Sequence, residues 1–79
     1  MMAMYTYDEE ADALYVLFVA EEDAVISRTD EISERVHADR DRTGTLVGIE
    51  ILHPRRGLEL GPIQEQLGIN LRVPFTFAA

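Results

Sequence analysis

The chain has 79 residues, 47% of them apolar, and its 15 acidic residues against 7 arginines give a formal net charge of −8. That apolar fraction excludes an intrinsically disordered chain, and the length fits a single domain whose core is marginal by itself. The sequence contains no cysteine, which excludes disulfide bridges, thiolate nucleophiles and cysteine-bound zinc.

Charge and apolar patterning predict a cytoplasmic protein that binds neither membranes nor nucleic acid. The longest apolar run, residues 13–20, is far shorter than the roughly 18 residues that cross a bilayer. No basic segment precedes an apolar stretch near the N-terminus, so no signal peptide is expected. Phosphate binding needs clustered basic side chains, and Arg55 and Arg56 form the only adjacent basic pair.

Residues 1–27 carry seven acidic residues and no basic one, which either favours a basic protein partner or serves solubility.

Two strands are predicted near the N-terminus, over residues 4–7 and 14–19, with a polar loop over 8–12 between them. The second run is apolar at nearly every position, which is typical of a strand covered on both faces. A buried helix is the alternative, but the run is short for a helix and no glycine closes it.

A hairpin is the next predicted unit. Residues 21–33 are polar without a clear period, which indicates a loop with a short strand at 25–26. Residues 35–40 alternate polar and apolar side chains, as in a half-exposed strand, although a helix capped by Thr29 is an alternative. The turn over 41–44 uses Gly44 for a positive φ, and residues 46–52 form the returning strand.

The C-terminal part predicts a short helix and an extended tail. Pro62 and Gly68 bound a helix over 62–67, which is too short to be stable unless it packs on the sheet. The predicted fold is therefore α+β: a single domain over 1–69 with three or four antiparallel strands and one short C-terminal helix. The apolar tail over 70–79 is predicted to lie across a neighbouring subunit of a homodimer.

Two segments resemble a small bacterial family catalogued as domain of unknown function 2283. They are residues 7–16, Y-D-E-E-A-D-A-L-Y-V, and residues 39–52, D-R-D-R-T-G-T-L-V-G-I-E-I-L, and the resemblance extends over roughly residues 5–60. It implies a small antiparallel sheet with a helix and no established activity. Some members look like the antitoxin of two-gene toxin–antitoxin pairs, which implies a role in binding a basic toxin. The motif residues are Tyr7, Asp8, Asp12, Leu14, Tyr15, Asp39, Asp41, Gly44, Gly48 and Glu50.

No catalytic residue, metal or cofactor is predicted. Residues 39–50 match most of a calcium-loop pattern, but that loop needs a helix on each side, which a hairpin denies. A metal site from His37, Asp39 and Glu50 is conceivable across paired strands, although two histidines at unrelated spacing form no metal signature. Asp8 and Asp12 are expected to bond to the loop backbone. Glu50 is expected to face solvent or pair with an arginine.

The function predicted from these observations is a non-enzymatic protein-binding module for a basic partner. A structural homodimer and, less favoured, a metal-dependent or hydrolytic enzyme are the alternatives. The predicted partner-binding residues are the acidic Glu9, Glu10, Glu21, Glu22 and Asp23, and the apolar tail residues Leu71, Val73, Phe75 and Phe77.

Overall fold

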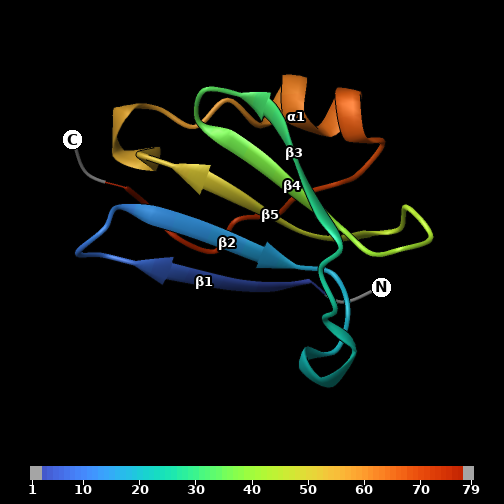
Figure 1. The fold of residues 1–79 in the computed structure, drawn as a ribbon. Helices are drawn as coiled ribbons and strands as arrows, with labels where there is room; N and C mark the ends of the chain where they lie inside the picture. Colours follow the sequence, from blue (N-terminus) through green and yellow to red (C-terminus); the bar gives the residue numbers. More distant parts are fainter. Residues whose placement is uncertain (1–2, 78–79) are drawn as a thin grey trace.

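The computed structural model describes residues 3–77 as a five-stranded antiparallel sheet with one α-helix against one face (Figure 1). The strands are β1 (Met4–Asp8), β2 (Ala13–Leu17), β3 (Arg28–Ser33), β4 (Val36–Arg40) and β5 (Leu46–Leu52). They lie in the order β1-β2-β5-β4-β3. The 3₁₀ turns η1 (Glu21–Asp23) and η2 (Pro54–Arg56) and the helix α1 (Leu60–Leu67) complete the elements. The predicted α+β class, the β4–β5 hairpin and the short C-terminal helix are confirmed.

The strand count was underestimated, because the expected loop over 21–33 contains the edge strand β3. Of its six residues only Ile32 is apolar, so the strand carries no apolar alternation. Its existence depends on pairing with β4, and a bulge between Glu31 and Ser33 interrupts the register. The short strand expected at residues 25–26 is instead a loop, in which Val25 is 63% exposed.

The expectation that the second strand is covered on both faces is wrong for the middle of β2. Leu14 and Val16 are fully buried on the face toward α1, whereas Tyr15 points to the opposite face and is only half-buried. An aromatic ring with a polar tip makes the sequence look continuously apolar while tolerating partial exposure.

The core lies between the sheet and a layer formed by α1 and the tail. Helix α1 buries Ile63 and ends at Gly68, whose φ of 66° is one that glycine adopts readily. Helix α1 begins at Leu60, two residues before the predicted start at Pro62. The tail contributes Leu71, which is 5% exposed and whose backbone N–H donates to Gln64 Oε1 at 2.6 Å. The tail thus covers the chain's own sheet, and its contact with a neighbouring subunit stays a prediction.

No helix within residues 3–77 is long and apolar enough to cross a membrane.

Candidate functional site

The face of the sheet that points away from α1, here called the open face, is rich in polar side chains. Strand alternation and register assign to it the residues Met4, Thr6, Asp8, Ala13, Tyr15, Leu17, Thr29, Glu31, His37, Asp39, Gly48, Glu50 and Leu52. Pairing places one row across four strands in the order Glu31, His37, Glu50, Tyr15. Residues far apart in the sequence therefore form one continuous surface.

Tyr15, Asp39 and Thr29 form a hydrogen-bonded network at the centre of the open face. The Tyr15 hydroxyl donates to Asp39 Oδ2 at 2.7 Å, and Thr29 Oγ1 donates to Asp39 Oδ1 at 2.6 Å. Both carboxylate oxygens are thus occupied, and three strands are connected through one side chain.

Gly48 allows this network to form, because the Tyr15 ring lies across it to reach Asp39 on the next strand. A Cβ at position 48 would stand 2.7 Å from Tyr15 Cζ and 2.8 Å from the backbone oxygen of Val16. Real side chains do not tolerate such distances, so the close approach requires glycine.

The environment of Tyr15 keeps its phenol protonated. Burial raises the pKa of Tyr15 above the usual 10.0, and the hydrogen bond to Asp39 and the charges of Asp39 and Glu50 raise it further. The Tyr15 hydroxyl is therefore a hydrogen-bond donor at neutral pH. Because the folded-state pKa exceeds the unfolded one, the stability that this protonation adds is complete below about pH 10 and is lost as the pH rises further.

An absorbance titration of tyrosinate checks this environment. We expect the Tyr15→Phe variant to lack the most alkaline transition of the wild type. Asp39→Asn removes a negative charge beside the phenol and is expected to lower the pKa of Tyr15. Asp30→Asn, at a carboxylate that pairs with Arg28 and Arg40 instead, serves as the control and leaves the transition in place. An unchanged curve for Asp39→Asn would contradict the assignment.

His37 and Glu50 complete the row beside Tyr15. His37 Nε2 lies 3.9 Å from Glu31 Oε1, and its Nδ1 is buried with no hydrogen-bond partner among the described residues. Glu50 is half-buried between the cross-strand neighbours Tyr15 and His37. Within residues 3–77 no arginine forms an ion pair with Glu50, so of its two expected environments the partly exposed one is observed.

The β4–β5 turn resembles a calcium loop in sequence only. Asp41 Oδ1 accepts hydrogen bonds from the backbone N–H groups of Thr43 and Thr45 at 2.9 and 3.0 Å and from Thr43 Oγ1 at 2.7 Å. The Thr43 side-chain hydrogen bond, followed by the backbone ones, lowers the pKa of Asp41. Gly44 supplies the positive φ of 87° that the turn needs. No group of three or more His, Asp or Glu side chains in residues 3–77 could hold a metal ion.

A second polar cluster joins the β1–β2 turn to the end of β5. Tyr7 donates through its hydroxyl to Asp12 Oδ1 at 2.7 Å, and His53 donates through its backbone N–H to the Asp12 carbonyl at 2.8 Å. Asp12 and His53 both have positive φ, at 51° and 53°. Asp8 Oδ1 accepts from two backbone N–H groups of the same turn, as predicted, whereas Asp12 binds a tyrosine instead. The cluster holds the turn in place.

A family model described as "Protein of unknown function (DUF2283)" matches residues 4–54, which is more than half of the chain. The chain is a member of the DUF2283 family. A search of the curated proteins and a search of the solved structures each gave no match. The matched segment of this DUF2283 chain contains all five strands, and therefore the whole open face, whereas α1 and the tail lie outside it.

The motif residues of this DUF2283 chain fall into four structural groups. Leu14 is in the core, and Asp8, Asp41 and Gly44 shape turns. Tyr7 and Asp12 form the second cluster, and Tyr15, Asp39, Gly48 and Glu50 form the centre of the open face.

The residues predicted to bind a partner do not form one patch. Glu9 and Glu10 lie in the β1–β2 turn, whereas Glu21, Glu22 and Asp23 form η1 at the opposite end of β2. All five are exposed. In the tail, Leu71 is in the core, Val73 and Phe77 pack against it, and Phe75 is 39% exposed beside the rings of Tyr7 and Phe77. Their role in binding stays a prediction.

The sequence analysis did not include Thr29 and Glu31 among the site residues. Residues 21–33 were expected to form a loop, so these two side chains could not be assigned to a face of the sheet. Their spacing of two residues is the signal that both project from one side of a strand. His37 and Asp39 show the same spacing on β4.

Proposed function

We propose that this DUF2283 chain is a protein-binding module whose open face docks on a basic protein. One observation carries the proposal. The described strand positions of the open face include four carboxylates, from Asp8, Glu31, Asp39 and Glu50, and no arginine. Complementary charge across an interface accelerates encounter and selects the partner.

The arginines near the sheet do not offset this negative surface. Arg28 and Arg40 both pair with Asp30, at 3.1 and 3.3 Å, and strand alternation assigns these three residues to the other face. Arg35 donates through Nε to the Leu52 carbonyl at 2.9 Å and through Nη2 to the carbonyls of His53 and Gly57. At one end of β2 the exposed acidic residues of η1 add further negative charge, whereas at the other end Glu9 pairs with Arg55 at 3.8 Å.

The half-exposed Tyr15 ring adds a flat surface beside Asp39 and Glu50. A guanidinium can stack on an aromatic face while pairing with neighbouring carboxylates, which an ammonium group does less well. The partner we propose is therefore rich in arginine at its contact. The toxin of a two-gene toxin–antitoxin pair, the partner that the family resemblance implies, is the class of basic protein we propose.

Charge reversal on the open face tests the proposal. We expect a tagged chain, purified from its native host, to bring down a basic protein. The double variant Glu31→Arg/Glu50→Arg is expected to weaken that complex by at least about tenfold, because two attractive contacts become repulsive. The control Glu59→Arg/Glu65→Arg makes the same change in net charge at two exposed residues on the helix side. It should bind nearly as the wild type does.

Three results would count against docking through the open face: retention of the partner by the Glu31→Arg/Glu50→Arg variant, equal loss in both variants, and no basic companion at all. The last result, together with self-association, would favour the second candidate, a structural homodimer. The observation that favours self-association is the exposure of Met4, Val25 and Ile26, at 52%, 63% and 50%. Met4 begins β1, and Ser27, which follows Ile26, donates its backbone N–H to the Arg40 carbonyl, so all three lie at one end of the sheet.

A further inference from the structure

His37 lies in the middle of the open face, between carboxylates on both neighbouring strands. The register places Glu31 of β3 opposite it on one side and Glu50 of β5 on the other. Its Nε2 atom lies 3.9 Å from Glu31 Oε1, and the phenol of Tyr15 follows Glu50 along the same row. Asp39, two residues further along β4, is a third carboxylate on this face. The charged groups around the His37 ring are therefore acidic.

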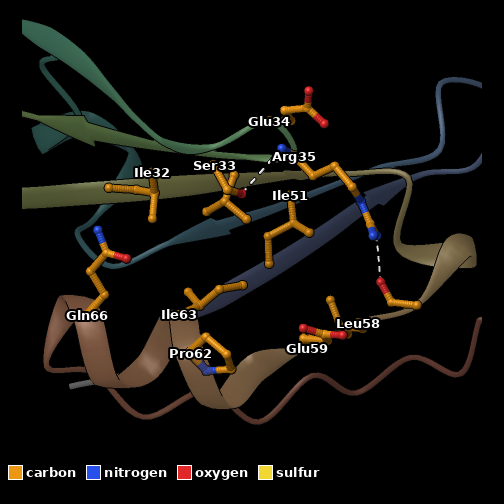
Figure 2. A pocket seen from close by; sticks show the side chains of 12 residues that line it. Ile32, Ser33, Glu34, Arg35, Ile51, Leu58, Glu59, Pro62, Ile63 and Gln66 are labelled. Carbon is orange, nitrogen blue, oxygen red and sulfur yellow. Dashed lines mark hydrogen bonds between the residues drawn. The ribbon is translucent and has the colours of Figure 1, made fainter.

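The arginine nearest to His37 in the sequence, Arg35, does not offset these carboxylates. Its guanidinium donates to the backbone carbonyls of Leu52, His53 and Gly57. Figure 2 shows it at a groove between the β3–β4 turn and α1, on the side of the sheet away from the open face. His37 is therefore the one side chain of its row that can become positive.

The two protonation states of His37 make different demands on their surroundings. The Nε2 atom faces a carboxylate, so the neutral ring carries its proton there and leaves Nδ1 as an acceptor. Nδ1 is buried and has no hydrogen-bond partner within residues 3–77. A charged ring carries a second N–H at Nδ1, and a buried N–H without an acceptor is costly. Glu50, the cross-strand neighbour on β5, is the carboxylate placed to accept from it.

We infer that protonation of His37 releases the basic partner from the open face, so that docking depends on pH. The inference rests on the proposed function, because it assigns a regulation to the same site. Beside the neutral ring, Glu31 and Glu50 are available to the partner's guanidinium groups. The charged ring pairs with these carboxylates itself and repels a guanidinium. Because the two binding events are linked reciprocally, docking within the imidazole titration range also releases a proton from His37 to the solvent.

A titration of the ¹⁵N-labelled full chain with a blocked oligoarginine peptide tests the inference, because arginine stays charged at every pH used. We expect saturable amide shifts at Glu31, His37 and Glu50. The affinity should be about five- to tenfold lower at about pH 5.5 than at about pH 8. Calorimetry near the middle of this range, in buffers of different protonation enthalpy, should show that binding releases protons to the buffer.

Three variants separate His37 from the other groups that titrate. His37→Gln has a neutral amide, so it should bind at both pH values as the wild type does at the higher one. His37→Lys carries a fixed positive charge and should bind at both pH values no more tightly than the wild type does at the lower one. His53→Gln is the matched control, since His53 follows β5 and lies beside Asp12, outside the row. It should keep the pH dependence of the wild type.

Failure of the inference and failure of docking give different results. If the peptide causes no shifts on the open face at either pH, docking through this face is wrong and the inference is wrong with it. If the peptide binds the open face with equal affinity at both pH values, docking stands and the inference is overturned. A pH dependence that His37→Gln retains, or binding without proton release, overturns the inference in the same way.

Discussion

Gly48→Ala is expected to lower the melting temperature by about 10 °C or more, since overpacking costs about 1–3 kcal/mol and each kcal/mol shifts a domain of this size by about 4–8 °C. The new methyl group would overlap the Tyr15 ring and stand 2.8 Å from the Val16 carbonyl oxygen. The ring can turn away only by giving up its hydrogen bond to Asp39, and the backbone of β2 has no such freedom. Thermal unfolding followed by circular dichroism measures the effect.

Two further variants establish the cause. Gly61→Ala, on the exposed side of α1 with no heavy atom within 4 Å of the new methyl, should leave the melting temperature unchanged or raise it. In a Tyr15→Leu background the ring is absent, so the same alanine at position 48 should cost less than it does in the wild type. Equal costs in the two backgrounds would show that Tyr15 is not the obstacle.

Local sequence patterns were sufficient to predict the β4–β5 hairpin. Alternation over residues 35–40, a glycine at the turn and β-prone residues over 46–52 all act between neighbours in the chain. Alternation along β5 also accounts for Gly48 and Glu50, which lie on one side of the strand. The helix was predicted from its bounding Pro62 and Gly68, although it begins earlier, at Leu60.

Contacts between distant parts of the chain were not predictable in the same way. Strand β3 has little apolar character, and only pairing with β4 makes it a strand. The open face depends on pairing between β2 and β5, which are separated by two other strands in the sequence. Nothing in the local pattern of Tyr15 shows that its hydroxyl reaches Asp39 across Gly48.

The place of the tail in the core was another long-range contact that local sequence patterns could not predict. The tail is an apolar segment that contains a proline. This pattern is equally consistent with a tail that packs on a neighbouring subunit and with one that packs on the sheet of its own chain. The structure puts Leu71 among Leu14, Ile49 and Ile63, because the turn at Gly68 directs the chain back across the sheet. A buried side chain in this place predicts a measurable contribution to folding.

Leu71→Ala is expected to destabilise the folded chain by about 2–5 kcal/mol, the usual cost of removing most of a buried leucine side chain. Leu71 is 5% exposed and belongs to the core cluster, so the truncation leaves a cavity under the sheet. Arg72→Ala is the matched control one residue later. The Arg72 side chain is exposed, and the hydrogen bond at this position runs from its backbone N–H to the Tyr5 hydroxyl at 2.8 Å, which alanine keeps. Its effect should stay within about 0.5 kcal/mol.

The dependence of the melting temperature on protein concentration shows whether Leu71 packs in the core of its own chain or in that of a neighbouring subunit. If the tail packs on its own sheet, the melting temperatures of the wild type and of Leu71→Ala do not change with concentration, and the difference between them is constant. A tail that clasps a second subunit couples folding to association, so the wild-type melting temperature would rise with concentration and the difference would widen. Because the chain buries Leu71 within one molecule, we expect the constant difference. A widening one would place the tail in the subunit interface.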